Sequence, residues 1–365
     1  MAGDGYGRLV ISVSVSEVDP NVPASPCSGH SPSSGVCLVM SLHLDIHDVG
    51  MTLESSEAEF LDFVARNYGP FIRESVTPKV RVMFSREAAE RARNVGVDLP
   101  RYGDGLFASQ DALFWKNEFG FESLVKATDD GLEVLAHHSG LDHEVDAEAR
   151  LRNFQRSMRW AVHFPIFALQ RRDLSRHLTH AAAVAGPEGA WVFAGLNGVG
   201  KSTLAARLLD RPGWSHVADN FLLGDASLLY PFPEVIRLSE ASLRAASGTA
   251  VSTPEAAVYG KHHLRARNVA DPVAPHAAFL VTNTSHLVLE LLDPMRALLI
   301  LRSLHDRLQE FPEYGHFAVL PVLDRFDHGP VPTVPPCLGA VRWYRLGLPL
   351  DWNLDSAIDR ILACV

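Results

Sequence analysis

A nine-residue stretch, GLNGVGKST, contains the residue types and spacing needed to hold a chain of phosphates. Gly195, Gly200, Lys201 and Ser202 fit the pattern G-x-x-x-x-G-K-[ST]. Glycines let backbone N–H groups close around phosphate oxygens, the lysine reaches the β and γ phosphates, and the serine hydroxyl ligates Mg²⁺. The expected loop consists of Gly195, Leu196, Asn197, Gly198, Val199, Gly200, Lys201, Ser202 and Thr203.

The residues on either side of this stretch supply the local structure that the motif requires. The apolar WVFA precedes it as an expected strand, and STLAARLL follows it as an expected helix. A chance glycine turn beside a lysine is the alternative, and both flanks argue against it. The sequence therefore predicts a nucleotide-binding loop between a strand and a helix.

A second chemical group follows in SHVADN at 215–220, which places Asp219 eighteen residues after Lys201. That interval has room for a helix, a turn at 211–213 and a returning strand. A carboxylate at such a strand end can accept a proton from an incoming hydroxyl, or hold Mg²⁺ through water. The alternative is an aspartate that caps a turn.

Motifs of other phosphate-loop proteins are missing or are better explained otherwise. The N-K-x-D tetrapeptide that GTPases use to read guanine does not occur. The nearest imitation of a motor ATPase strand is LVLELLD at 287–293, where Glu290 and Asp293 are spaced like one face of a helix. We expect an amphipathic helical segment there.

The order of these features resembles the core of the HPr kinase/phosphorylase family and its HPr-kinase-like relatives. The likeness is carried by His180 with AAAV after it, by the GLNGVGKST loop and by HVADN, and it covers about 178–225. PFPEVIRLSE at 231–240 and GKHHLRAR at 260–267 are similar in kind. The resemblance implies an α/β fold with a mixed sheet, of the type shared with phosphoenolpyruvate carboxykinase, and a centre formed by His180, the loop and an aspartate pair.

Two departures from the family pattern refine what the resemblance implies. The aspartate pair is Asp219–Asn220 in this chain, although the Asn220 carbonyl can still coordinate Mg²⁺ or accept a hydrogen bond. The R-G-x-G-I signature of the bifunctional enzymes is missing, which argues against phosphorylase activity and against HPr as the substrate. Because HPr kinase is itself a hexamer, the resemblance also raises a homo-oligomer as a state to test.

Further polar residues are candidates for the same site. In KHHLRAR, a strand would put Lys261, His263, Arg265 and Arg267 on one face, and Arg265 is the candidate for stabilising charge on a transferred phosphoryl group. A solvated basic edge strand is the alternative. Glu234 is a candidate second carboxylate for the metal, which gives Ser202, Asp219, Asn220 and Glu234 as expected metal-site residues. His137, His138 and His143 imitate a metal cluster, but their spacing favours a polar loop.

Three regions are expected to position these groups. We expect a flexible leader at 1–39, because 20–36 are rich in Pro, Ser and Gly. A second low-complexity segment, at 329–337, is rich in proline. Residues 40–145 predict an α+β domain for acceptor recognition or an accessory role, with a hairpin around DVG, a helix in EAEFLDFVARNY and a hairpin around 129–131. Residues 146–365 predict the nucleotide-binding domain, opened by a helix that Pro165 bends or ends.

Composition limits the cellular setting and the partners. Thirty-three Lys and Arg against 43 Asp and Glu give a formal charge of −10, which argues against a surface that wraps nucleic acid. No apolar run approaches the roughly 20 residues that cross a bilayer. The cysteines have neither metal-site spacing nor the pattern of a secreted disulfide framework: Cys27, Cys37, Cys337 and Cys364. We expect a cytoplasmic protein without nucleic-acid or membrane partners.

Together these features predict a kinase that transfers the γ-phosphate of ATP, or of another nucleoside triphosphate, with Mg²⁺ as cofactor. Asp219 is the expected general base, Lys201 contacts the phosphates, and His180 orients the acceptor or the γ-phosphate. The acceptor hydroxyl belongs to a serine of a protein or peptide, or to a small metabolite. A nucleotide-binding scaffold or sensor and a simple NTPase remain open as alternatives.

Overall fold

The computed structural model describes residues 12–15, 38–103, 105–143, 145–232, 234–245, 257–258, 260–307, 334–349 and 351–364. These residues form two compact units, and the boundary between them falls between Ile166 and Phe167. The domain boundary that the sequence predicts is at 145/146 instead. Residues 20–36 and most of the proline-rich segment at 329–337 lie outside the described part of the chain.

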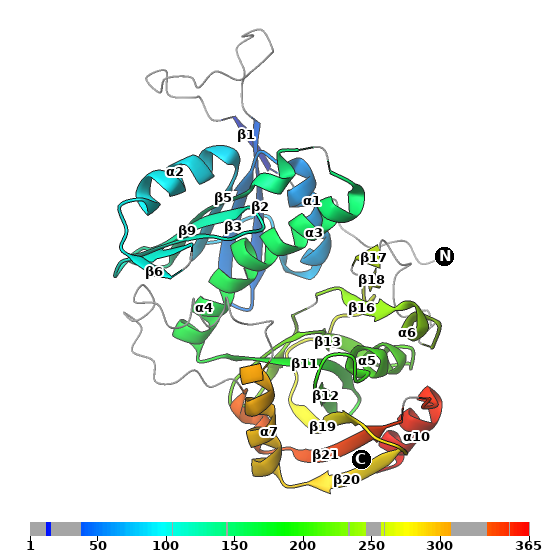
Figure 1. The fold of residues 1–365 in the computed structure, drawn as a ribbon. Coiled ribbons are helices and arrows are strands. Elements are labelled where there is room, and N and C mark those ends of the chain that lie inside the picture. Colours follow the sequence, from blue (N-terminus) through cyan, green and yellow to red (C-terminus); the bar gives the residue numbers. More distant parts are fainter. Residues whose placement is uncertain are drawn as a thin grey trace. The chain divides into compact units, whose positions relative to one another are not determined.

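The first unit is built around a mixed sheet, with the order β1-β2-β3-β5-β10-β9-β8-β7-β6 and β4 paired to β2. Figure 1 labels β1, β2, β3, β5, β6 and β9 of this sheet. β3, β5 and β10 are mutually parallel, and their other neighbours are antiparallel. Its strands are β1 (Ser12–Val15), β2 (Leu38–Ile46), β3 (Val49–Ser55), β4 (Ile72–Arg73), β5 (Val80–Phe84), β6 (Arg101–Gly103), β7 (Leu106–Ala108), β8 (Ala112–Lys116), β9 (Phe121–Ala127) and β10 (Leu132–His138). Its helices are α1 (Ala58–Asn67), η1 (Gly69–Phe71), α2 (Arg86–Gly96), η2 (Ser139–Leu141), α3 (Ala147–Met158) and η3 (Arg159–His163).

The predicted local elements of this unit are confirmed. β2 and β3 form the first hairpin, and its turn is His47–Asp48, both with positive φ, rather than DVG. The second hairpin joins β9 and β10, and α1 is the predicted helix. The prediction of a flexible leader was wrong for Ser12–Val15, which form a strand paired with β2. The valines of SVSV are β-branched, and such residues favour a strand.

Pro165 does not end the helix that begins at Ala147. α3 passes into a five-residue π-helical turn, η3, and then into α4 (Phe164–Leu174), which contains the proline. Proline has no N–H to donate, and an inserted π turn is a common way for a helix to accommodate such a break in its hydrogen-bond ladder. The predicted helix is therefore present and longer than expected.

The second unit contains a mixed sheet with the order β15-β14-β11-β12-β19-β21-β20, and β13 also pairs with β11. Its strands are β11 (His177–Gly186), β12 (Gly189–Ala194), β13 (Ser215–Ala218), β14 (Phe221–Gly224), β15 (Leu229–Tyr230), β19 (Pro275–Asn283), β20 (Val288–Leu292) and β21 (Arg342–Leu348), beside a small sheet of β16 (Ile236–Ser239), β17 (Ala257–Val258) and β18 (Lys261–Leu264). Its helices are α5 (Lys201–Leu209), α6 (Glu240–Ala245), α7 (Pro294–Arg307), η4 (Pro336–Gly339) and α10 (Leu354–Cys364). The α/β class with a mixed sheet is thus confirmed.

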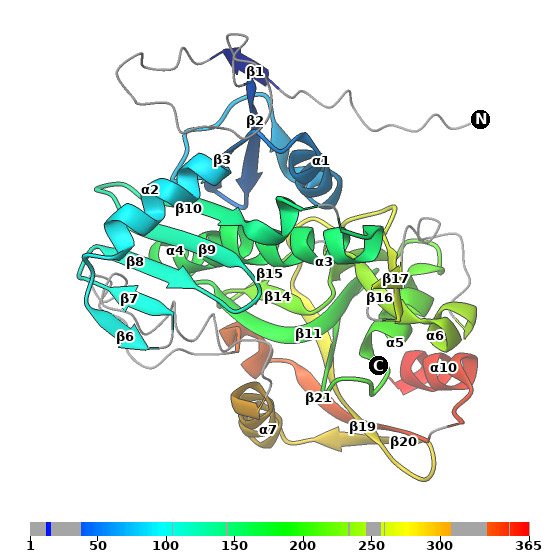
Figure 2. The same cartoon turned by 45° about the horizontal axis from the view of Figure 1, so that its top comes forward.

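Helices cover both faces of this second sheet. On one face, Ala182 and Phe193 pack in one core cluster with Leu204 of α5 and Ile358 of α10. Figures 1 and 2 show α5 and α10 side by side. On the opposite face, neighbouring strand residues pack against Leu301 of α7.

One element of this unit differs in type from its prediction. The segment at 287–293 forms strand β20 and not an amphipathic helix, because it pairs antiparallel with β21 at the edge of the sheet (Figure 2). Glu290 lies opposite Arg345, and their side chains form an ion pair of 3.6 Å. Pairing with a distant strand has overridden the helical preference of leucine and glutamate. None of the described helices is long and apolar enough to cross a membrane.

Candidate functional site

The strand, loop and helix predicted around GLNGVGKST are present in the second unit. β12 ends at Ala194, and α5 begins at Lys201. Gly195, Gly198 and Gly200 have φ values of +147°, +80° and +102°, which residues other than glycine rarely adopt. A Cβ on Gly195 would also lie 2.4 Å from the Val281 carbonyl oxygen. Backbone geometry therefore favours glycine at these positions.

The lysine of the loop is buried and bonded to the loop itself. The Lys201 Nζ donates to the carbonyl oxygens of Gly195, over 3.0 Å, and of Leu196, over 2.9 Å. The ammonium group therefore lies against the loop backbone, at the start of α5. A cation and the positive end of a helix at one point favour a bound anion.

Sheet topology brings Asp219 to this loop. β12 and β13 are both antiparallel to β11, on its two sides, and are therefore parallel to each other. Their carboxyl ends lie at the same edge of the sheet, so the residues that follow Ala194 and Ala218 can meet. They do meet, because the Ser202 Oγ donates a hydrogen bond of 2.7 Å to Asp219 Oδ1.

Asp219 is a buried carboxylate with two polar partners and nearby positive charge. Its other oxygen, Oδ2, accepts a hydrogen bond of 3.3 Å from the backbone N–H of Arg237. Burial raises the pKa of Asp219, although the Ser202 hydrogen bond and the charges of Arg237 and Lys201 act in the opposite direction. A carboxyl group with a raised pKa holds a proton more tightly than an ordinary aspartate does.

Asn220 and Glu234 lie next to Asp219 and contact each other. Asn220 has a φ of +79°, a left-handed conformation that asparagine tolerates better than most residues. Its side-chain amide donates to Glu234 Oε2 over 3.4 Å. Glu234 is brought there by a return of the chain, in which the Phe232 N–H donates to the Val217 carbonyl over 2.8 Å.

These oxygen-bearing residues fit the donor set that Mg²⁺ prefers. Mg²⁺ in nucleotide sites takes one or two protein carboxylates and completes its shell with phosphate oxygens and water. Ser202 Oγ and Asp219 Oδ1, which are 2.7 Å apart, supply a hydroxyl and a carboxylate at one point. Glu234 and Asn220 are the next oxygen-bearing side chains.

His180 lies beside this pair on β11. It is the fourth residue of that strand, and its side chain is buried. It is opposite Phe221 in the sheet, and the next N–H, of Ala181, donates to the Asn220 carbonyl over 3.3 Å. Alternation along a strand places it on the same face as Ala182, which α5 covers. His180 therefore lies on the loop-helix side of the sheet.

The basic segment at 261–267 departs from its prediction. β18 ends at Leu264, so no continuous strand aligns Lys261, His263, Arg265 and Arg267 on one face. β18 is also the middle strand of its small sheet, which excludes the solvated edge strand. His263 is buried, and burial, together with the charges of Arg237 and Arg265, lowers its pKa to about 4.

Arg237 is the functional candidate that sequence reasoning missed. Its N–H contacts Asp219, and its charge acts on the Asp219 carboxyl, whereas Arg265 acts on His263. The signal available in the sequence was its place three residues after Glu234 in PFPEVIRL. Contact with Asp219 depends on a chain return that no local pattern shows.

The prediction of a polar loop was wrong for His137 and His138, which lie in a strand, and it holds for His143. His137 and His138 end β10 with buried side chains, and His143 is exposed. Burial is the main cause that lowers the pKa of His138 to about 4. Among the described residues, no three histidine, cysteine, aspartate or glutamate side chains are grouped to hold a metal ion.

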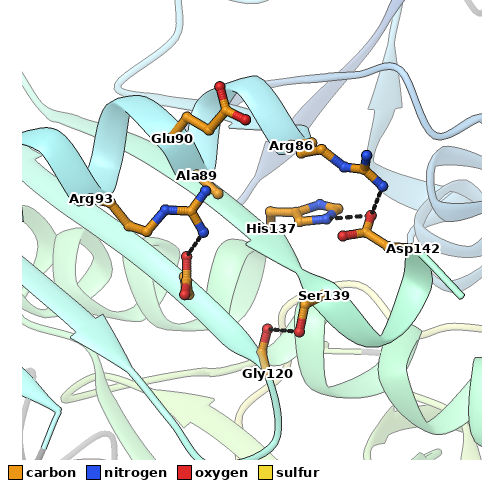
Figure 3. Close-up of a pocket in the computed structure, with 9 residues that line it drawn as sticks. Arg86, Ala89, Glu90, Arg93, Gly120, His137, Ser139 and Asp142 are labelled. Carbon is orange, nitrogen blue, oxygen red and sulfur yellow. Dashed lines mark hydrogen bonds and ion pairs between the residues drawn. The ribbon is translucent and has the colours of Figure 1, made fainter. Parts of the chain in front are cut away.

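His137 lines a cavity of about 130 Å³ in the first unit, between α2 and the ends of β9 and β10 (Figure 3). Asp142 Oδ1 accepts hydrogen bonds from His137 Nε2, over 2.8 Å, and from the Arg86 guanidinium, over 3.0 Å. Arg93 forms an ion pair of 2.7 Å with Glu122. The cationic side chains at this cavity thus already pair with carboxylates of the same unit.

Chemically, the second unit combines an anion-binding loop, a hydroxyl, a buried carboxylate and a nearby arginine. These are the groups that a site for phosphoryl transfer needs. No known family model matches the sequence, and no curated protein matches it significantly. The function is therefore argued from these groups and their positions.

Proposed function

We propose that this protein is a Mg²⁺-dependent kinase that transfers the γ-phosphate of ATP to a hydroxyl group. The acceptor is a serine of a protein or peptide, or a small hydroxylated metabolite, and the setting is the cytoplasm. The proposal includes an HPr-kinase-like core in the second unit, of the type found in phosphoenolpyruvate carboxykinase. The observation that carries it is the 2.7 Å hydrogen bond between Ser202 of the loop and Asp219.

In this proposal each residue acts on a defined part of the reaction. Backbone N–H groups of 195–203 and the Lys201 ammonium bind the β and γ phosphates. Asp219 takes the proton of the acceptor hydroxyl while the oxygen of that hydroxyl bonds to the γ-phosphorus and the nucleoside diphosphate leaves. Burial raises the pKa of Asp219, so this carboxyl binds a proton more tightly than an ordinary aspartate does.

The remaining polar residues hold the reacting groups in place. Ser202 and Asp219, with Glu234 and Asn220 nearby, would hold Mg²⁺, which neutralises the negative charge of the phosphates when it is bound. His180 orients the acceptor or the γ-phosphate from the neighbouring strand. Arg237, with Arg265 farther along the chain, supplies positive charge for the transferred group.

A specific observation favours a second candidate, a nucleotide-binding scaffold or sensor with weak transfer. The Asn220 amide donates a hydrogen bond to Glu234, so these two side chains are one neutral amide and one carboxylate rather than two metal-binding carboxylates. Replacing Asn220 by Asp separates the candidates. A large gain in turnover would indicate a degenerate site, and a loss would indicate that Asn220 is part of a working one.

The direct test is incubation of the full chain with ATP, Mg²⁺ and a panel of serine peptides and hydroxylated metabolites, followed by mass spectrometry. We expect an acceptor that gains one phosphate, and a rate about 10²- to 10⁴-fold lower in Asp219→Asn. Asp271→Asn, at an exposed position of the same unit, is the matched control. Equal transfer by wild type and Asp219→Ala would disprove the role of Asp219.

The same assay distinguishes the alternatives. Phosphate release without any phosphorylated acceptor across the panel would support a simple NTPase. Nucleotide binding without release or transfer would support the scaffold.

A further inference from the structure

Three parallel strands end beside one another at the edge of the sheet that carries the loop. β12, β19 and β21 are neighbours and run in the same direction. Each continues at its carboxyl end into a connecting segment, and the Thr284 N–H after β19 donates to the Leu348 carbonyl of β21 over 2.9 Å. In open α/β sheets, ligands bind outside the carboxyl ends of such strands. The segment after β21 therefore lies at the edge where a ligand of the loop would bind.

Trp352 follows β21 and lies directly against the loop. The ring atoms Cζ2 and Cη2 are 3.1 Å and 3.7 Å from the position that a Cβ on Gly200 would occupy. Gly200 immediately precedes Lys201, so the indole is next to the residues that hold phosphates in the proposed function. The backbone N–H of Trp352 donates to the Pro349 carbonyl over 3.3 Å, which fixes the start of the segment.

The indole is held by packing and still retains exposed surface. It packs on the core cluster that contains β12 and α5 residues, yet its burial is only intermediate. A fixed, partly exposed aromatic ring is the kind of surface on which nucleobases stack, and every base has a face that can do so. Tryptophan provides the largest such face among the amino acids.

We propose that Trp352 is the platform on which the base of the bound nucleotide stacks, an inference that rests on nucleotide binding at 195–203. Stacking depends on the area of the base and not on its hydrogen-bonding edge. The site would therefore take purine nucleoside triphosphates, with ATP and GTP binding similarly and both binding more tightly than UTP. Trp352 would be a specificity-determining residue and not a catalytic one.

Calorimetric titration of the full chain in Mg²⁺ with ATP, GTP, UTP and inorganic tripolyphosphate tests this proposal. We expect wild-type protein to bind ATP and GTP more tightly than UTP, and tripolyphosphate most weakly. Trp352→Leu should lose about 5- to 150-fold in affinity for ATP. It should keep the wild-type affinity for tripolyphosphate, because the phosphate-binding residues are unchanged. Trp352→Phe, which keeps a smaller ring, should lie between the two.

The outcomes separate this inference from the proposed function. Wild-type protein that binds neither ATP nor tripolyphosphate would overturn both. Wild-type protein that binds ATP and tripolyphosphate equally would overturn the stacking platform alone, and this result does not depend on any variant folding. Trp352→Leu that is folded and binds ATP as wild type does would overturn it as well.

Discussion

The side-chain amide of Asn220 donates a hydrogen bond to Glu234 Oε2 across 3.4 Å. Asn220 directly follows the buried Asp219, and through this bond it gives Glu234 an uncharged partner. An aspartate at 220 could keep the left-handed backbone, because Asp and Asn both tolerate that conformation. It would, however, face Glu234 with a second negative charge.

Asn220→Asp should therefore make the stability of the protein depend on Mg²⁺. Without the metal, the lost hydrogen bond and the repulsion from Glu234 should lower the free energy of unfolding by about 1–3 kcal/mol. With Mg²⁺ the loss should be largely recovered, because a cation can bridge two carboxylates. Thermal melting of both proteins with Mg²⁺ and with a chelator measures the difference.

The matched control is the double variant Asn220→Asp, Glu234→Gln, which restores one amide and one carboxylate to the pair. Its stability without Mg²⁺ should return toward that of wild type. If Asn220→Asp is equally destabilised with and without Mg²⁺, the two side chains do not form a cation site.

In the first unit, Asp142 should be a stabilising residue because it satisfies two donors. Burial alone would raise its pKa, but hydrogen bonds from Arg86 and His137 outweigh burial and hold the pKa below its ordinary value. Asp142→Ala leaves the buried His137 Nε2 without its acceptor and should cost about 1–3 kcal/mol in urea unfolding.

Glu90→Ala provides the comparison for this variant. Glu90 lines the same cavity from an exposed position on α2, and its removal should change stability by no more than about 0.5 kcal/mol. Equal losses in the two variants would show that the cavity as a whole, and not the Asp142 acceptor, sets the stability.

Local sequence signals were sufficient for the elements that close within a short stretch of chain. The β2–β3 and β9–β10 hairpins each join neighbouring strands through a tight turn, and both were predicted. The strand, loop and helix around 195–203 follow from glycine conformation and helix propensity. Asp219 at a strand end was also correct, since SHVA forms β13 just before it.

Features that depend on distant parts of the chain were not predictable in the same way. β20 became a strand only because β21, some fifty residues later, pairs with it. The contact between Arg237 and Asp219 requires the chain to return along β13 after Phe232. His137 and His138 resemble a polar loop by composition, but the sheet buries them at the end of β10.

A buried histidine on β13 should make the protein less stable in acid. Burial lowers the pKa of His216 to about 4, against 6.5 for an ordinary histidine. Between these values the unfolded chain binds a proton that the folded protein does not, so the free energy of unfolding falls as pH falls. The slope approaches about 1.4 kcal/mol per pH unit for this one group.

The variant His216→Leu fills the buried site with an apolar side chain of similar size and removes the titrating group. Chemical unfolding at pH 7, 6 and 5 should give a smaller loss of stability in the variant than in wild type. His286→Gln, at an exposed position, tests whether loss of any histidine is enough. Parallel curves for wild type and His216→Leu would rule out His216 as a source of the acid sensitivity.

Two glycines of the loop allow backbone strain to be separated from crowding by Trp352. Gly198 and Gly200 both have positive φ, so alanine at either position should cost about 1–2 kcal/mol from backbone strain. A Cβ at Gly198 meets no atom within 4 Å, whereas one at Gly200 lies 3.1 Å from the indole of Trp352.

Gly200→Ala should therefore lose more stability and more nucleotide affinity than Gly198→Ala, by the amount needed to displace the indole. Adding Trp352→Leu to Gly200→Ala should remove that excess in stability, because a smaller side chain no longer meets the new methyl group. Thermal melting and ATP titration of the two single variants and the double variant measure both effects. Equal losses in Gly198→Ala and Gly200→Ala would mean that the indole of Trp352 does not pack closely against Gly200, and Trp352 would then have no contact with the phosphate-binding loop.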